Sequence, residues 1–215
     1  MEYQVADLAR DVRIAIDTNN SSAQLTAVSD IDTLTIDEII TSKLADAARM
    51  VETLAPAYLL DSGKAFATSI SWNSGGTKTW GYTQLPGDFL RLSSFQMADW
   101  KRPVSIAINE NDPIYTQQRS EFKGIGGNPN NPVVAIVQWP VGLVLEFYSC
   151  TSTNVAVLRA RYIPIPTVNG TSIGICEKLK PAVVYYAAYL TLLSIGDLET
   201  AKKMLEASNI LMERK

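Results

Sequence analysis

Histidine is absent from this 215-residue chain, and cysteine occurs only twice, as Cys150 and Cys176. Without histidine, no Ser-His or Cys-His catalytic pair can form, and the usual zinc sites are excluded. Two cysteines are too few for a disulfide framework, and we favour two reduced, mostly buried thiols over a disulfide between them. We predict a protein with no catalytic residues, no cofactor and no metal site.

Long apolar runs are also lacking. The longest one extends from Pro181 to Ile195, whereas a helix that spans a bilayer needs about 20 apolar residues. The first residues, MEYQVADLARDVR, are charged and amphipathic, unlike the apolar core of a secretory signal. We therefore expect no membrane partner, and folding in a reducing cytosol.

Basic residues do not outnumber acidic ones either, and the net charge is -3. The charge is spread unevenly: residues 1–55 carry ten acidic and four basic side chains, residues 56–175 carry seven and nine, and residues 176–215 carry five and six. This balance argues against a polybasic nucleic-acid binder. The hydrophobic content of 47% is typical of a globular protein with one domain, or one domain with an insertion.

Helical periodicity marks both ends of the chain. Thr35 and Glu38 have the spacing of a capping box, and Pro56 predicts the end of that helix. Gly196 and Asp197 suit the end of one helix and the start of the next. The predicted helices span residues 4–17, 35–55, 177–195 and 197–213.

Between these helices the apolar period changes to two, which predicts strands. NSGG, residues 73–76, is expected to join KAFATSISW and TKTWGYTQL into a hairpin. Further extended runs are predicted at Asp88–Met97, Pro103–Ile108, Ile114–Phe122, Val133–Trp139, Leu143–Tyr148 and Val155–Ile163. We predict an α+β fold, in which residues 1–60 and 175–215 form a helical bundle and residues 61–174 an inserted, mainly antiparallel β-sandwich or barrel-like domain. This prediction excludes a continuous helix anywhere within residues 64–122.

Two groups of side chains leave functional alternatives open. Asp88, Asp99, Glu110 and Asp112 lie near turns, where paired carboxylates can hydrolyse a glycosidic bond, although such residues more often cap backbone amides. Trp72, Trp80, Trp100 and Trp139 all lie in the predicted β domain, where they form either a sugar-stacking platform or anchors of a core or interface.

The segment around Trp100 carries the most distinctive pattern, LPGDFLRLSSFQMADWKRPV at residues 85–104. Its basic pair next to a tryptophan suits nucleic acid, but solvated charges at a surface or interface are the more common explanation. Three tyrosines on one face of the helix after Pro181 indicate a core or a subunit contact. The candidate interface residues are Trp100, Lys101, Arg102, Tyr115, Arg119, Glu121, Lys123, Tyr185, Tyr186 and Tyr189.

Residues 109–132, NENDPIYTQQRSEFKGIGGNPNNP, contain prolines, which restrict the backbone of the residue before them, and three glycines, which are costly to order. An excursion of this length inside a compact domain is usually functional or disordered. We predict an arm that projects from the β domain and gains order against a neighbouring subunit; the alternative is a hairpin without a partner.

The split helical bundle with its β insertion, the segment YTQLPGDFLRLSSFQMADWKRPV and the closing YYAAYLTLLSIGDLETAKKMLEASNI resemble the head-to-tail connector proteins of short-tailed bacteriophages. These proteins are also called portal adaptor, ring or gatekeeper proteins, and the resemblance is closest to those of Bacteroides-infecting crAss-like phages. The residues from Leu85 to Trp100 carry the most specific part of the likeness.

The resemblance implies a non-enzymatic virion protein at the head-tail junction, assembled in the host cytoplasm. Its partners would be further copies of itself, in a ring of twelve, together with the portal protein, tail or nozzle proteins, and viral DNA in transient, non-specific contact. Two alternatives remain at this stage: a β-sandwich module that binds carbohydrate or a receptor, and a glycoside-processing enzyme.

Overall fold

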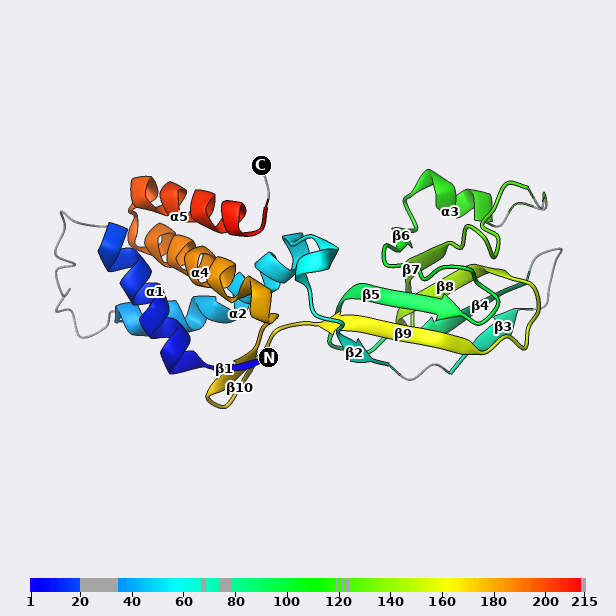
Figure 1. The fold of residues 1–215 in the computed structure, drawn as a ribbon, viewed down its shortest axis with the longest axis horizontal. Helices are drawn as coiled ribbons and strands as arrows, with labels where there is room; N and C mark the ends of the chain where they lie inside the picture. The colour runs from blue at the N-terminus through cyan, green and yellow to red at the C-terminus, as the bar shows by residue number, and fades with distance from the viewer. Residues whose placement is uncertain are drawn as a thin grey trace. The chain divides into compact units, whose positions relative to one another are not determined.

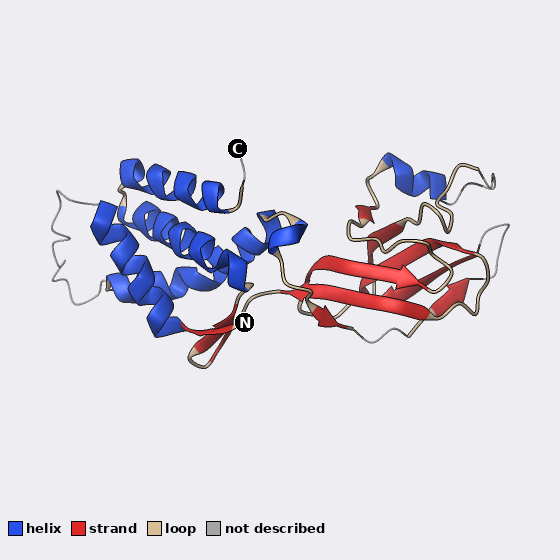
Figure 2. Ribbon diagram, in the orientation of Figure 1, coloured by secondary structure: helices blue, strands red, loops and turns tan. Residues whose placement is uncertain are grey.

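A computed structural model describes residues 1–19, 35–66, 69–73, 79–118, 120, 122 and 124–213 of the chain. The chain forms two compact units, one made of Met1–Asp61 with Ile165–Lys215 and the other of Ser62–Pro164. Helices dominate the first unit and strands the second (Figures 1 and 2). The predicted α+β class is confirmed.

The helical unit contains α1 (Val5–Asn19), α2 (Ile36–Leu54), α4 (Lys180–Ile195) and α5 (Leu198–Leu211), with short 3₁₀ turns at Ala57–Leu59 and Glu177–Leu179. Local chemistry sets these boundaries as predicted. Thr35 and Glu38 form a reciprocal capping box at the start of α2. Gly196 ends α4 with a left-handed φ of 86°, and the Asp197 side chain accepts a bond from the Thr200 amide.

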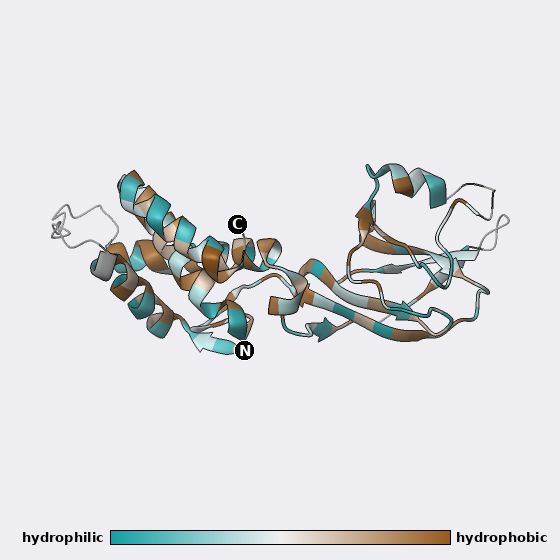
Figure 3. Ribbon diagram, turned by 45° about the horizontal axis from the view of Figure 1, so that its top comes forward, coloured by the Kyte–Doolittle hydropathy of each residue, from teal (hydrophilic) through white to brown (hydrophobic). Residues whose placement is uncertain are grey.

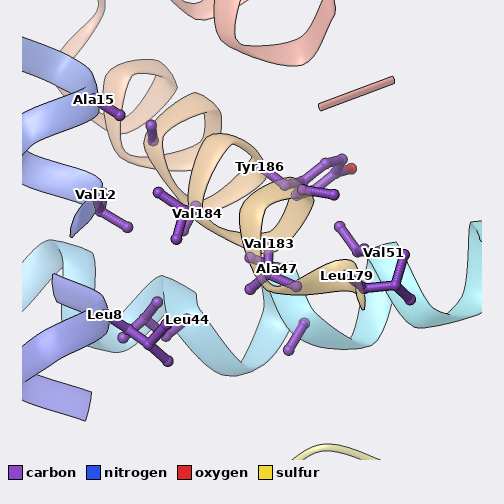
Figure 4. Packing of buried hydrophobic residues seen from close by; sticks show 14 of the residues in the cluster. Leu8, Val12, Ala15, Leu44, Ala47, Val51, Leu179, Val183, Val184 and Tyr186 are labelled. Carbon is purple, nitrogen blue, oxygen red and sulfur yellow. The ribbon is translucent and has the colours of Figure 1, made fainter. Parts of the chain in front are cut away.

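Helix α4 is apolar on nearly all sides because its neighbours cover most of it. It packs against α1, α2 and α5. Figure 4 shows side chains of α1, α2 and α4 meeting in one core, among them Leu8, Leu44 and Val183. Each fully buried side chain of this size contributes about 1.5–3 kcal/mol. Figure 3 shows the outer helices mixing polar and apolar residues, and on α5 Leu198 is 61% exposed.

A small sheet joins the N-terminus to the helical unit. It has the strand order β1 (Glu2–Gln4), β11 (Ser172–Gly174) and β10 (Val168–Asn169). The turn between β10 and β11 contains Asn169-Gly170, a favoured hairpin pair, and Gly170 adopts the required positive φ of 62°. Residues 165–174 therefore belong to the helical unit, and the predicted boundary at 174 was wrong by ten residues.

The β unit is built from two sheets. One has the order β2 (Lys64–Ala65), β9 (Val157–Pro164) and β5 (Phe89–Met97); the other has the order β3 (Ser71–Asn73), β4 (Thr79–Gln84), β8 (Gly142–Cys150), β7 (Val134–Trp139) and β6 (Ile108–Asn109). The pairs are antiparallel except for β6 with β7. Side chains from both sheets meet in an aromatic core that includes Phe95, Phe147 and Tyr162.

Two predicted strands, Ile114–Phe122 and Pro103–Ile108, do not form as expected, and the exclusion of helix from residues 64–122 is wrong as well. Residues 113–118 form helix α3 (Pro113–Gln118) instead of a strand, which contradicts the exclusion of helix within residues 64–122. Asp112 explains α3, because its side chain accepts a bond from the Ile114 amide at 2.8 Å and Pro113 suits a first helical turn. Within Pro103–Ile108, Val104 forms only an isolated bridge and Ile108 begins β6.

The first predicted hairpin is only half correct. Residues 71–73 pair with β4 as expected, but residues 64–65 pair with β9 in the other sheet. The chain thus crosses between the two sheets after Phe66. In β9, the expected alternation fails at Leu158, which is 66% exposed, because the register with β5 shifts between Gln96 and Met97.

The chain enters and leaves the β unit at neighbouring positions. Lys64 is paired with Tyr162 in the antiparallel β2–β9 ladder, which sets the start of β2 beside the end of β9. Gly63 precedes this pair with a φ of 73°, and a Cβ atom at Gly63 would lie 2.2 Å from the Tyr162 carbonyl oxygen. Only glycine fits here without a backbone shift.

Candidate assembly surfaces

The distinctive segment at residues 85–104 forms part of the core of the β unit. Trp100 is 3% exposed, and its ring lies 5.7 Å from Phe95 and 6.5 Å from Phe147. Trp100 therefore does not belong to an exposed interface, contrary to the prediction. The apolar residues of this segment pack against aromatic side chains of both sheets, so the segment helps to hold the two sheets together.

The carboxylates considered for glycoside chemistry have structural partners. Asp88 accepts a hydrogen bond from the Tyr162 hydroxyl at 2.7 Å, and burial together with this carboxylate raises the pKa of Tyr162 to about 12. Asp99 accepts bonds from the amide and hydroxyl of Thr151 at 2.7 and 3.0 Å. Asp99 and Asp112 thus accept from backbone amides, as expected of carboxylates near turns, whereas Asp88 accepts from a side-chain hydroxyl instead.

Lys101 and Arg102 are exposed and lie where the segment 109–132 returns to the sheet. The Lys101 amide donates to the Pro129 carbonyl at 2.9 Å, and the Arg102 guanidinium donates to the side-chain oxygen of Asn131. Both residues thus help to fix the end of that segment. Arg119, Glu121 and Lys123, which we predicted as interface residues, lie outside the described residues.

The described part of residues 109–132 packs against its own unit. The Tyr115 ring lies 6.3 Å from that of Tyr148, and its hydroxyl donates to Glu146 at 3.1 Å. Gln118 is 2% exposed, and its side-chain oxygen accepts a bond from the Gly127 amide at 2.7 Å. This arrangement differs from the projecting arm that we expected, because Tyr115 and Gln118 supply buried contacts that the polar sequence did not suggest.

The same segment and the residues just before it expose several apolar side chains. Exposed fractions are 77% for Ile106, 45% for Ile114, 72% for Phe122 and 49% for Ile125. Exposed apolar side chains of this size are candidates for contacts with another protein where they lie together. Sequence reasoning did not single out these residues, because Ile106, Ile114 and Phe122 fall in segments that were predicted as strands and Ile125 lies between two glycines.

Glu146 is the centre of a polar cluster that sequence reasoning also missed. It is fully buried, and it accepts hydrogen bonds from the Tyr115 hydroxyl, the Trp139 indole at 3.0 Å and the Tyr148 hydroxyl. Burial, followed by the bond to Glu146, raises the pKa of Tyr148. One signal was available: a glutamate inside the apolar run VLEFY indicates a buried carboxylate with local donors.

Trp139, which belongs to this cluster, is also part of a row of three aromatic rings. Tyr82 lies between Trp80, with ring centroids 6.5 Å apart, and Trp139, at 4.5 Å. The cross-strand pair Tyr82–Glu146 puts these rings on the same face of the sheet as Glu146. All three side chains are half-buried, so they form a partly exposed aromatic row.

The predicted tyrosine cluster lies on α4. Tyr186 is buried, and burial raises its pKa, whereas Tyr185 and Tyr189 are half-buried at the margin of the same core. The rings of Tyr186 and Tyr189 lie 5.4 Å apart in an edge-to-face arrangement. Tyr186 is thus a core residue, and a subunit contact through Tyr185 or Tyr189 stays a prediction.

In the described part of the chain, no three His, Cys, Asp or Glu side chains gather in a way that suits a metal ion. The described helices also include none that is both long and apolar enough to cross a membrane. No protein-family description matches the sequence, and the search of curated proteins finds no match either.

Proposed function

We propose that this protein is a structural subunit of a phage head-to-tail connector, an adaptor ring between the portal and the tail. The observation that carries the proposal is the division of the chain into a helical unit, built from both ends, and a β unit inserted between them. This is the arrangement on which the resemblance to connector proteins rests. The segment 85–100, the most specific part of the resemblance, contributes to the core of the inserted unit.

In this proposal the protein has a structural role: it links the portal to the tail and catalyses no reaction. A ring forms when one surface of a subunit contacts a different surface of the next and the rotation closes. The two units offer different surfaces for such contacts, including the exposed apolar side chains at residues 106–125. The portal and a tail or nozzle protein would contact opposite sides of the ring, and viral DNA would pass through it.

The test is to produce the full chain alone and together with its cognate portal protein, and to examine both samples by negative-stain microscopy and native mass spectrometry. We expect closed rings, at least in the presence of the portal, because a portal can serve as a template. A closed two-fold dimer as the assembled form would overturn the proposal, since its two copies would use the same surface.

One observation favours a second candidate function, a carbohydrate-binding module. Trp80, Tyr82 and Trp139 form a row on one face of a sheet, as in a stacking platform, and all three are half-buried. Titration with oligosaccharides, followed by tryptophan fluorescence, separates the two candidates. Saturable quenching that Trp139→Ala abolishes, while Trp72→Ala on another strand retains it, would favour the binding module over the adaptor.

A further inference from the structure

The face of the five-stranded sheet that carries Glu146 also presents a pair of half-buried aromatic rings. The rings of Tyr82 and Trp139 have centroids 4.5 Å apart, and Trp80 lies 6.5 Å from Tyr82 on the other side. Strand register puts the pair on this face: Tyr82 and Ala135 are the two cross-strand partners of Glu146, and Trp139 follows Ala135 at an even spacing on β7.

The fixed charge of this face is negative. The strands β3, β4, β7 and β8, which the structure describes in full, contain no Lys or Arg, and Glu146 is their only acidic residue. Because Glu146 is fully buried, water screens its charge poorly. Its carboxylate accepts the Trp139 indole N–H at 3.0 Å. This bond pushes electron density into the indole ring and adds to the negative potential that aromatic rings have over their faces.

The orientation of the rings suits a compact cation better than a flat sugar. A stacking platform needs rings that are close to coplanar, whereas Tyr82 and Trp139 are tilted by 42°, and Trp80 and Tyr82 by 38°. A guanidinium is planar, weakly hydrated and small enough to lie on one tilted ring. Among basic side chains, Arg makes cation–π contacts more often than Lys, and Trp is the best ring for them.

We propose that Tyr82 and Trp139 bind an arginine side chain of a partner protein. A protein is favoured over a free ligand because Trp, Tyr and Arg are the side chains that most often dominate binding at protein interfaces. Ser71, the cross-strand partner of Tyr82, and Gln84 are exposed on the same face and offer oxygen atoms to the guanidinium N–H groups. This contact goes beyond the connector proposal and does not depend on it.

The test titrates the full-length protein with N-acetyl-arginine amide and with N-acetyl-citrulline amide, in which a neutral urea group replaces the guanidinium. Nitrogen–proton NMR spectra of the four indole groups follow binding. The Trp139 signal should shift saturably with the arginine compound, with an affinity about fivefold or more above that for the citrulline compound. The signal of the core residue Trp100 should not move. Equal responses to both compounds would overturn the inference, because the face would then not recognise charge.

Two variants assign the binding to the ring pair and to the charge beneath it. Tyr82→Leu should lower the affinity for the arginine compound about fivefold or more, whereas Tyr58→Leu, at a 59% exposed tyrosine of the helical unit, should leave it unchanged. Glu146→Gln should weaken binding of the arginine compound only. Circular dichroism identifies the folded variants, and unchanged affinity in folded Tyr82→Leu contradicts the inference. The citrulline comparison decides on wild-type protein even if a variant does not fold.

A neutral oligosaccharide distinguishes this inference from the carbohydrate-binding candidate. If cellohexaose shifts the Trp139 signal at lower concentrations than the arginine compound does, the aromatic row binds sugar and the inference is wrong. No shift with cellohexaose, together with a saturable response to the arginine compound, supports the arginine site.

Discussion

At the scale of single residues, the buried carboxylate of Glu146 is the most consequential side chain in the β unit. Three donors from α3, β7 and β8 converge on it. A buried donor that loses its acceptor costs about 1–3 kcal/mol. Glu146 thus ties helix α3 to the sheet through hydrogen bonds, whereas the core on the opposite face relies on aromatic packing.

Replacing this carboxylate should destabilise the β unit. We expect Glu146→Ala to lower the free energy of unfolding by about 3 kcal/mol, and Glu146→Gln by less, because an amide retains one acceptor oxygen. Urea denaturation followed by tryptophan fluorescence measures the change. Glu110→Gln, at an exposed position, is the control and should be neutral. A neutral Glu146→Ala variant would show that these hydrogen bonds do not hold the cluster together.

The two thiols should be unreactive in the folded protein. Burial is the main cause that raises the pKa of both Cys150 and Cys176 to about 12. These values exceed the unfolded value of about 8.5, so the folded state holds the thiol protons more tightly than the unfolded state does. The free energy of unfolding should therefore be at its full value below about pH 8.5 and should fall as the pH rises toward 12. A thiol reagent at neutral pH should label neither cysteine until denaturant is added; rapid labelling of the native protein would contradict this.

At the scale of elements, the start of α2 depends on its capping box. The Glu38 amide donates to the Thr35 hydroxyl oxygen at 3.4 Å, and the Thr35 amide donates to the Glu38 carboxylate at 2.7 Å. We expect Thr35→Ala to cost about 1 kcal/mol in thermal or urea unfolding. Thr41→Ala is the matched control in the same helix, because the Thr41 hydroxyl only bonds the carbonyl of Asp37.

The capping box also predicts a pH dependence. Hydrogen bonds from Thr35 lower the pKa of Glu38, so this stabilisation is present above the unfolded pKa of about 4.3 and is lost as the pH falls through the folded value. The difference in stability between wild type and Thr35→Ala should therefore shrink in acid. A difference that stays constant down to the folded pKa would mean that the carboxylate is not part of the cap.

The elements show why the sequence predicted the helical unit better than the β unit. Helix boundaries follow from local chemistry, as at Thr35 and Gly196, and these predictions are confirmed. Strand partners are set by distant residues: β2 and β3 are close in sequence but join different sheets. Helix α3 was missed although Asp112 and Pro113 mark its start, because its six residues are too few to show a helical period and its contact with Glu146 comes from far along the chain.

The same distinction applies to the candidate surfaces. Sequence reasoning correctly singled out the segment around Trp100 but assigned it to an interface, because burial of Trp100 depends on Phe147 from another strand.

At the scale of the whole molecule, the two units should fold separately, because each has its own core. We expect residues 62–164 alone to fold as a β protein. We also expect residues 1–61 joined to 165–215 by a short Gly-Ser linker to fold as a helical one. Circular dichroism and thermal melting test both pieces, and an unfolded piece would show that its unit depends on the other.

Passage of DNA through a ring requires weak contacts. We expect the full-length protein to bind duplex DNA no more tightly than about 10⁻⁴ to 10⁻⁶ M at physiological salt, without sequence preference. Fluorescence anisotropy with two unrelated duplexes of equal length measures both properties. Nanomolar, salt-resistant binding to one sequence would contradict the role of a channel wall.

The neighbouring entry and exit of the β unit have a consequence for the order of folding during synthesis. The ribosome completes residues 62–164 before α4, the central helix of the helical unit, has been made. Once β2 has paired with β9, the two ends of the β unit lie next to each other. The two halves of the helical unit then no longer have to meet across about a hundred flexible residues. Each doubling of a flexible loop costs about 0.6 kcal/mol, so early β folding spares the later step about 3 kcal/mol. The insertion would then guide the folding of the unit that it interrupts.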